Sequence, residues 1–377
     1  MKLNLKDKNI YYLFSSITYI PYFISLIIES KKRNYKNVFI LRYNYKDYTN
    51  PLSEDNLKII YDYSKKYSFK IKLESEIQFR KLNNIIFVVD GDIYGPPKTF
   101  KKKEINSSLL KKIDLSKNLI LNLTENYNFI PIYNYYIDNV DYCFFGNKSI
   151  IETDYSNLKG KYLMETEEYN FNSDKNIFLG NTKYDNNFNK DELILKYNLN
   201  KNLKYCIILF PKKAFSIFYD ESDLINLYNQ LRILNYKLIV KCRPKDHIEN
   251  KFLQGDIYVC SEIYPSETLE LMHLVDLCVI SSSSAIEETV FCEVPCIDFI
   301  SDDKPWRNQF LLDKKVYYQV DEWKNIKSDQ ILCIIEKLEK RDSNYFKILK
   351  DKYLFSHNNS AEKYFNFIED KFIIKNN

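Results

Sequence analysis

The feature that most constrains the fold is an alternation of two kinds of segment along the whole chain. Short apolar runs rich in β-branched and aromatic residues, typical of buried strands, are separated by longer runs with apolar residues at helical spacing. A strand, a helix and a further strand form the repeating unit of a parallel sheet that is covered by helices. The alternation therefore predicts an α/β protein.

The apolar runs locate the expected elements. In the first half, the predicted strands are Tyr11–Phe14, Val38–Arg42, Lys70–Leu73, Ile85–Val89, Leu119–Asn122 and Tyr142–Phe145, and the predicted helices are Ile17–Glu29 and Asn56–Tyr67. In the second half, the strands are Cys206–Phe210, Lys237–Lys241, Ile257–Cys260, Leu277–Ser281, Cys296–Phe299 and Val316–Gln319. The helices there are Glu221–Leu234, Ser266–Val275 and Ala285–Phe291, followed by three terminal helices at Asp329–Lys340, Asn344–Leu354 and Ser360–Phe372.

A polar stretch from Glu167 to Asn202 interrupts the pattern near the middle of the chain. At 377 residues the chain is long enough for two domains with separate cores. We therefore expect an N-terminal domain at residues 1–170 and a second domain at residues 171–355. The last helix, in residues 356–377, is expected to cross back to the first domain.

The segment Asn9–Ile28 is almost long and apolar enough to cross a bilayer, and charged residues lie on both sides of it. Two serines, a threonine and Pro21 interrupt the run. This favours a strand, a turn and a helix, with a membrane anchor as the alternative. Peripheral association with a membrane would not need this segment.

Charge and cysteine usage exclude several classes of protein. The 55 basic and 51 acidic residues leave a formal charge of +4, too balanced for a dedicated nucleic-acid binder. Most of the eight cysteines lie within or beside strand-like runs, no Cys-x-x-Cys pair occurs, and there are three histidines. This pattern predicts reduced, buried thiols in a reducing compartment, and no structural metal.

Four consecutive serines, Ser281–Ser284, follow an apolar run and precede a helical stretch. A buried strand, a tight turn and a helix N-terminus together form an anion site, because unpaired N–H groups and the helix dipole point outward there. Serine hydroxyls would add donors. The alternative is an ordinary helix N-cap.

Basic residues follow the neighbouring predicted strands. Lys212 and Lys213 come after one strand, and Lys241, Arg243 and Lys245 lie at the end of the next. Open parallel sheets bind ligands at the carboxyl ends of their strands, so we expect these cations to share a rim with the serine turn. Cations and amide donors together suit a diphosphate.

Two further residues complete the expected nucleotide site. Glu288 lies one turn into the helix and could accept hydrogen bonds from a ribose diol, or it could be a surface carboxylate that the helix dipole favours. Tyr264 or Pro265 would flank the base.

These motifs resemble a known superfamily. The segment "EIYPSETLELMHLVDLCVISSSSAIEETVFCEVPCIDF" (Glu262–Phe299) resembles the nucleotide-binding half of GT-B glycosyltransferases, closest in spacing to UDP-N-acetylglucosamine 2-epimerases. The segment "NIFLGNTKYDNNF" (Asn176–Phe188) resembles the "GN-x-x-x-D" element of those epimerases and of CDP-glycerol glycerophosphotransferases. "LIVKCRPKDH" (Leu238–His247) resembles the strand that ends in "HP" in both groups.

The resemblance implies two Rossmann-like domains facing a central cleft, with helices closing the chain. It places the UDP-binding residues on Ser282, Ser283, Ser284 and Glu288. Ser283 and Ser284 stand where the epimerases have glycines, so backbone approach to the diphosphate is less close. Arg243 replaces the histidine of "HP" with a permanent cation.

The first half is expected to supply the acceptor side and the base. "FVVDGDIYGPP" resembles the epimerase "HGD" loop, with Asp92 as its aspartate, and Asp90 is nearby. "NLTENYNFIP" resembles the strand end that carries the "EAG" glutamate, here Glu125. Each of the three carboxylates could instead be a turn or cap residue. The paired glutamates expected after Pro131 are missing, as is the epimerase start motif, which argues against elimination and re-addition of UDP.

The leading hypothesis is a glycosyltransferase that moves a sugar from a nucleotide-activated donor to a hydroxyl of a glycan or lipid-linked acceptor, in surface polysaccharide synthesis. The alternatives are a UDP-N-acetylglucosamine 2-epimerase, a transferase that uses a CDP- or CMP-linked donor, and an inactive nucleotide-sugar-binding protein. We expect no cofactor besides the UDP- or CMP/CDP-linked donor and no required metal. We also expect a cytoplasmic location, with the inner face of a membrane left open. The sequence gives no oligomeric state.

Overall fold

The chain forms two compact units. The computed structural model describes residues 9–14, 20–41, 54–90, 112–114, 116–123, 140–146, 174–185, 188–209, 221–242, 255–259, 266–281, 283, 285–299, 318–320, 325–339, 346–347, 350 and 359–375. One unit comprises residues 1–186 and 352–377, and the other comprises residues 187–351. The domain boundaries predicted from the sequence lie near residues 170 and 355, whereas in the structure the chain passes from one unit to the other after residues 186 and 351.

The first unit is built on a seven-stranded sheet in the order β3-β2-β1-β4-β5-β6-β7, and all neighbouring strands are parallel. The strands are β1 (Asn9–Phe14), β2 (Lys36–Leu41), β3 (Lys70–Leu73), β4 (Ile86–Asp90), β5 (Leu119–Leu123), β6 (Tyr142–Phe145) and β7 (Asn176–Phe178). The predicted α/β class with a parallel sheet is confirmed. The central strands form where buried β-branched and aromatic residues run continuously, as expected for a sheet covered on both faces, whereas the edge strand β3 is largely exposed.

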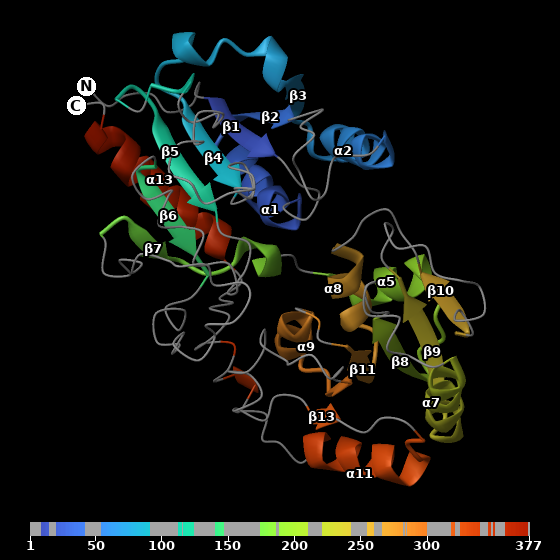
Figure 1. Cartoon of the computed structure of the whole chain (residues 1–377). Helices are drawn as coiled ribbons and strands as arrows, with labels where there is room; N and C mark the ends of the chain where they lie inside the picture. Colours follow the sequence, from blue (N-terminus) through green and yellow to red (C-terminus); the bar gives the residue numbers. More distant parts are fainter. Residues whose placement is uncertain are drawn as a thin grey trace, which may run out of the picture. The chain divides into compact units, whose positions relative to one another are not determined.

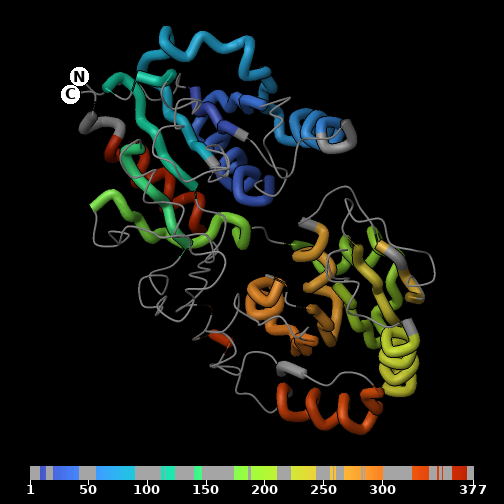
Figure 2. Tube along the Cα trace, in the orientation of Figure 1, coloured from blue at the N-terminus to red at the C-terminus, as the bar shows by residue number. Residues whose placement is uncertain are grey.

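Helices and short 3-10 turns surround this sheet. They are α1 (Ile20–Lys32), α2 (Glu54–Tyr67), η3 (Glu74–Glu76), η4 (Phe79–Lys81), η10 (Thr182–Asp185) and α13 (Ser360–Lys375). Helix α1 has lysines in its last turn, where the helix dipole favours positive charge. The C-terminal helix α13 packs beside α1 in this unit, as the red and blue segments of Figures 1 and 2 show.

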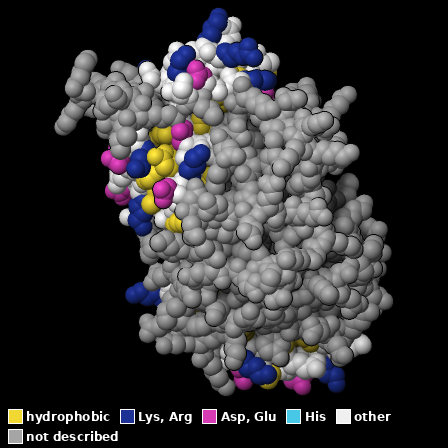
Figure 3. All heavy atoms as spheres, turned by 60° about the vertical axis from the view of Figure 1, so that its left-hand side comes forward, with side chains coloured by type: hydrophobic (Ala, Val, Ile, Leu, Met, Phe, Trp, Pro, Cys, Tyr) yellow, Lys and Arg dark blue, Asp and Glu magenta, His cyan; other side chains and the backbone are white. Residues whose placement is uncertain are grey.

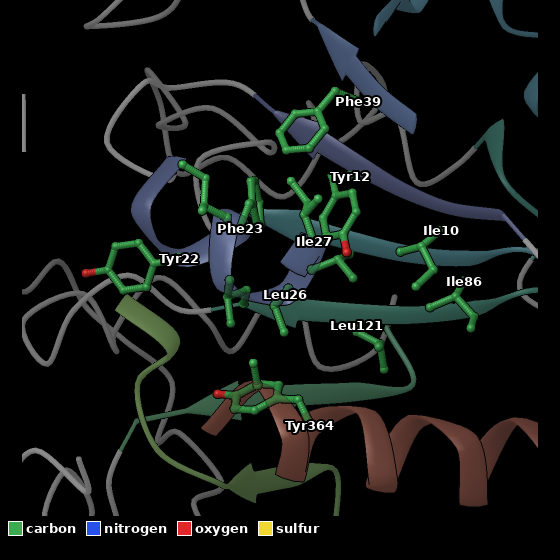
Figure 4. Packing of buried hydrophobic residues seen from close by; sticks show 14 of the residues in the cluster. Ile10, Tyr12, Tyr22, Phe23, Leu26, Ile27, Phe39, Ile86, Leu121 and Tyr364 are labelled. Atoms are coloured by element: carbon green, nitrogen blue, oxygen red, sulfur yellow. The ribbon is translucent and has the colours of Figure 1, made fainter. Parts of the chain in front are cut away.

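An aromatic core fills the space between the first sheet and helices α1 and α13 (Figure 4). The rings of Tyr12 and Phe39 stack at 5.1 Å, and Phe23 from α1 lies 5.4 Å from Tyr12 and 5.9 Å from Phe39. The ring of Tyr364 from α13 packs against that of Phe144 of β6, with 4.3 Å between the ring centroids. These rings fix α1 and α13 on one face of the sheet, because each large buried side chain has one place to pack.

The second unit contains a six-stranded parallel sheet in the order β10-β9-β8-β11-β12-β13. Its strands are β8 (Lys204–Leu209), β9 (Tyr236–Lys241), β10 (Ile257–Val259), β11 (Leu277–Ile280), β12 (Cys296–Phe299) and β13 (Tyr318–Val320). The helices are α5 (Lys190–Lys196), α7 (Glu221–Ile233), α8 (Ser266–Met272), α9 (Ile286–Cys292) and α11 (Ser328–Glu339). The predicted terminal helix Asn344–Leu354 lies largely outside the described residues.

The apolar segment near the N-terminus forms β1 and then α1, so the preferred prediction of a strand followed by a helix is confirmed there. Within the described ranges, no helix has the length and apolar character that crossing a membrane requires. On the face shown in Figure 3, the described basic and acidic side chains are interspersed.

Candidate functional site

The two sheets share a topological property that locates candidate sites. In each sheet the strand order reverses direction once, between β1 and β4 in the first and between β8 and β11 in the second. Ligands of open α/β sheets bind outside the carboxyl ends of the strands at such a switch point. The topology therefore selects the segments that follow these four strands.

In the second unit these segments are those that the sequence singles out. The chain leaves β8 at Leu209 and continues into "FPKK", and it leaves β11 at Ile280 and continues into the four serines. Strands β8 and β11 are hydrogen-bonded neighbours, with Ile208 opposite Val279. Strand β9, which precedes Arg243, lies on the other side of β8. The predicted cationic and serine segments thus start from adjacent strand ends.

In the first unit, β4 ends at Asp90, at the switch point. Residue 90 pairs with Leu123, the last residue of the neighbouring strand β5, which Glu125 follows by two positions. The segments with the three candidate base carboxylates therefore start from two adjacent strands.

Most of the predicted site residues lie outside the described residues, so their placement stays a prediction. These are Asp92, Glu125, Lys212, Lys213, Arg243, Tyr264, Ser282 and Ser284. The backbone of Asp90 is described, and Ser283 and Glu288 are described with their side chains.

Ser283 caps the turn that leads into α9. Its hydroxyl oxygen accepts a hydrogen bond from the backbone N–H of Ala285 at 3.2 Å, and its carbonyl accepts one from Ile286 at 3.4 Å. The N-cap position itself is occupied by Ala285, which provides no side-chain cap. Accepting this bond uses a lone pair of the hydroxyl and not its proton, so capping by Ser283 is compatible with donation to an anion.

Glu288 is a buried residue, which corrects the alternative that it is a surface carboxylate. Both Glu287 and Glu288, in the first turn of α9, are less than a tenth exposed. Glu288 lies close enough to β11 to affect the pKa of the Cys278 thiol. Burial raises the pKa of the Cys278 thiol well above its ordinary value, and neighbouring groups, Glu288 among them, raise it further.

Lys241 was predicted to lie on the open cationic rim, but it is buried. Its side chain is 2% exposed, and its ammonium group lies 3.0 Å from a carboxylate oxygen of Glu267, itself 8% exposed. Strand β9 alternates its side chains, so Lys241 faces away from the core that contains Leu238, Val240 and Cys242. Lys241 is therefore committed to an ion pair inside the second unit.

A tyrosine, a lysine and a second glutamate near this pair were not predicted from the sequence. The Tyr197 hydroxyl donates to a carboxylate oxygen of Glu270 at 2.6 Å, and Lys196 pairs with the same carboxylate. Burial, followed by Glu270 and Glu267, raises the pKa of Tyr197 far above its ordinary value. One signal was readable: Asn189 caps α5 through the N–H groups of Asp191 and Glu192, a typical helix start before an apolar stretch.

The "GN-x-x-x-D" element holds the C-terminal helix. Asp185 accepts hydrogen bonds from the backbone N–H groups of Ser360, at 2.9 Å, and Ala361, at 2.5 Å, at the start of α13. The Tyr364 hydroxyl donates to the carbonyl of Gly180 at 2.9 Å, and the φ of Gly180 is 100°, which favours glycine. The element thus has a structural role in the first unit.

The cysteines in the described residues are all free thiols, and most are buried. Cys278 of β11 lies directly opposite Cys296 of β12, and burial also raises the pKa of Cys206 well above its ordinary value. In the described ranges, no group of three or more His, Cys, Asp and Glu side chains could hold a metal ion.

No protein-family model matches the chain, and no curated protein matches it in sequence. Solved structures match it over almost its full length. The wall teichoic acid polymerase TagF is 13% identical with a TM-score of 0.58, covering 99% of this chain and 90% of that one. The glycotransferase of kitacinnamycin is 8% identical with a TM-score of 0.54, covering 98% and 100%. The UDP-GlcNAc 2-epimerase from Neisseria meningitidis, bound to UDP-GlcNAc, is 11% identical with a TM-score of 0.53, covering 96% and 99%.

These proteins act differently, and what they share with the chain at such low identity is architecture. In this chain that architecture consists of two parallel sheets, each with one switch point. The chain has the two-domain GT-B fold.

Proposed function

We propose that this chain is a glycosyltransferase that moves a sugar from a nucleotide-activated donor to a hydroxyl acceptor. The observation that carries the proposal is the match between topology and chemistry. In the second unit, the strands at the switch point run into the lysine pair and the serine turn. In the first unit, the corresponding strand runs into Asp90 and Asp92. One sheet offers groups for an anion and the other offers carboxylates.

In this mechanism the second unit binds the diphosphate and the first unit supplies the base. Lys212, Lys213 and Arg243 neutralise the charge that develops on the departing diphosphate, and the serine turn donates hydrogen bonds to it. One of the three carboxylates takes the proton from the acceptor hydroxyl as that oxygen attacks the anomeric carbon. The nucleoside diphosphate then leaves with the electron pair of the broken C–O bond, and the mechanism uses no metal ion.

Other proteins with this fold support nucleotide-sugar chemistry. One of the matching structures contains UDP-GlcNAc, and another is of a glycotransferase. A CDP-linked donor is the second candidate, because a wall teichoic acid polymerase matches 99% of the chain and the "GN-x-x-x-D" element resembles that of CDP-glycerol glycerophosphotransferases. The expected acceptor is a glycan or a lipid-linked precursor at the cytoplasmic face of a membrane.

The first experiment measures donor binding by calorimetry with UDP, CDP and CMP. Replacing Lys213 with Ala removes a charge-assisted contact and should weaken binding of the preferred nucleotide about 10- to 100-fold. Lys204→Ala is the matched control, because Lys204 is an exposed lysine at the opposite, amino end of the strand that leads to Lys213. Equal affinities of the two variants would contradict the proposed site.

The second experiment identifies the base. Asp90→Asn, Asp92→Asn and Glu125→Gln are compared in single-turnover assays with the nucleotide sugar that binds. One variant should lose about 10²- to 10⁴-fold in rate while its affinity for the nucleotide is retained. Full activity of all three variants would refute a base in this unit, and sugar conversion without an acceptor would favour an epimerase.

A further inference from the structure

His273 packs against two aromatic rings in the second unit, directly after helix α8. Its ring centroid lies 5.3 Å from that of Phe188 and 5.9 Å from that of Phe291 in α9, with which it makes an edge-to-face contact. Its Nε2 atom is buried and has no hydrogen-bond partner within the described structure. A buried polar atom without a partner costs free energy, and a buried charge costs more. The position therefore suits the neutral imidazole better than the protonated one.

The residues around His273 come from both ends of the second unit. Phe188 is the second residue of this unit and Lys350 is its last but one. The ammonium group of Lys350 lies 5.6 Å from the centre of the Phe291 ring and 2.6 Å from a carboxylate oxygen of Glu293, which caps the end of α9. A series of contacts from Phe188 through His273 and Phe291 to Lys350 thus joins both ends of the unit to α8 and α9. We call these four residues the end latch.

Two lysines act on the imidazole, one from each end of the unit. Lys190 and Lys350 both oppose its protonation. On α8 and α9, and on the turn that follows α8, carboxylates are paired or buried: Glu267 with Lys241, Glu270 with Lys196, Asp276 with the backbone N–H of Tyr205, Glu293 with Lys350, and Glu287 and Glu288 buried in the first turn of α9. Beside Lys190, Asp191 and Glu192 are exposed in the first turn of α5.

Two features favour a protonated His273, because the C-terminal end of a helix and the face of a phenyl ring both attract positive charge. Burial, followed by Lys350 and Lys190, outweighs them and lowers the pKa of His273 below its ordinary value of 6.5. The pH-dependent stability that the neutral imidazole contributes is therefore fully present above pH 6.5 and is lost as the pH falls through the folded-state pKa.

We infer that His273 is a pH-sensitive switch within the end latch: in its neutral form it holds the first and last residues of the second unit on α8 and α9, and on protonation it releases them. Protonation places a third positive charge beside Lys190 and Lys350 in a partly buried position. Separation of the two chain ends from α8 and α9 then lets water reach all three cations. No ligand takes part, so the inference does not depend on the proposed function.

The first measurement is an NMR titration of the full chain with labelled histidine rings. The other two histidine signals are identified with His247→Gln and His357→Gln. We expect the His273 ring to titrate below pH 6.5, and a midpoint at or above 6.5 would overturn the inference.

A pair of lysine variants tests the geometry of the latch in the same titration. Lys350→Met removes one of the two opposing cations and should raise the His273 midpoint. Lys347→Met is the matched control, because Lys347 is exposed three positions earlier and should leave the midpoint unchanged. Equal midpoints in the two variants would overturn the inference, since Lys350 would then not face His273.

Hydrogen exchange, corrected for the intrinsic exchange rate, tests the release itself. It is measured about one pH unit above and below the midpoint found by NMR. Below the midpoint, protection of the amides in residues 188–196 and 346–350 should fall about tenfold, while that of α11 in the same unit should not change. His273→Phe keeps an aromatic ring that cannot be protonated, so its protection should not fall. Unchanged protection at the two ends, an equal loss in α11, or the same fall in His273→Phe would each overturn the inference.

Discussion

Replacing Asp185 with Ala should loosen the C-terminal helix from the first unit. Asp185 caps the start of α13, since its two carboxylate oxygens accept hydrogen bonds from the backbone N–H groups of Ser360 and Ala361. Loss of an N-cap costs about 0.5–2 kcal/mol. The upper end of this range applies because two N–H donors lose their acceptor in a partly buried position. We therefore expect the free energy of local unfolding of α13 to fall by about 2 kcal/mol.

Hydrogen exchange measured by mass spectrometry gives this local free energy directly. A loss of about 2 kcal/mol corresponds to a drop of about 30-fold in the protection of the α13 amides. Asp62→Ala is the control, because Asp62 is 65% exposed and pairs with Lys65 at a distance of 3.9 Å. Unchanged protection of α13 in Asp185→Ala would refute the reasoning, since it would mean that the aromatic contacts alone hold the helix.

Three further outcomes are expected. Burial raises the pKa of Asp185 above its ordinary value of 3.8, so the pH-dependent part of the stability it contributes is fully present below pH 3.8 and is lost as the pH rises through its folded-state pKa, while its hydrogen bonds to the start of α13 remain. The stability of the wild type relative to Asp185→Asn should therefore increase on acidification in urea titrations, and a difference that is constant with pH would contradict this. Phe39→Ala should lower the free energy of unfolding by about 3–5 kcal/mol, because Phe39 is 2% exposed and its ring packs against those of Tyr12, Phe23 and Phe69. Iodoacetamide should label the exposed Cys333 in the native chain while the buried Cys206 and Cys278 react after unfolding, as peptide mapping would show.

The sheets could be predicted from the sequence because a buried parallel strand carries its signal locally. Three strands, β3, β6 and β12, begin and end at the predicted residues; Glu74 follows β3, Asp141 precedes β6 and Pro295 precedes β12. Strand β7 was not predicted as a strand, because it is a three-residue edge strand in a polar stretch. Its pairing with β6 supplies the stability that its own side chains do not, and pairing is a tertiary property.

The chemistry of the candidate site was less readable than the fold. A lysine at the end of a strand is typical of a solvent-exposed rim, and nothing near Lys241 in the sequence shows that its carboxylate partner lies 26 positions further on. The set of cations predicted to bind the diphosphate therefore wrongly included Lys241. The alternative for Glu288, a surface carboxylate, was wrong for a related reason: acidic residues in a first helical turn are usually on the surface, whereas here the turn packs against β11.

The two interpretations of the serine turn, a helix cap and an anion site, are compatible with each other. The sequence offers either a helix cap or an anion site, and the structure has Ser283 acting as a cap for the N–H of Ala285. A hydroxyl has one proton and two lone pairs, so the oxygen that caps the turn can also donate to a phosphate. The cap would then orient the hydroxyl, because the hydrogen bond from Ala285 fixes one lone-pair direction and restricts where the proton can point. A Ser283→Ala variant loses both roles, and Ser283→Thr retains them. Weakened nucleotide binding in the first variant and normal binding in the second would therefore favour a turn that caps and binds at once, whereas normal binding in both would leave capping as its role.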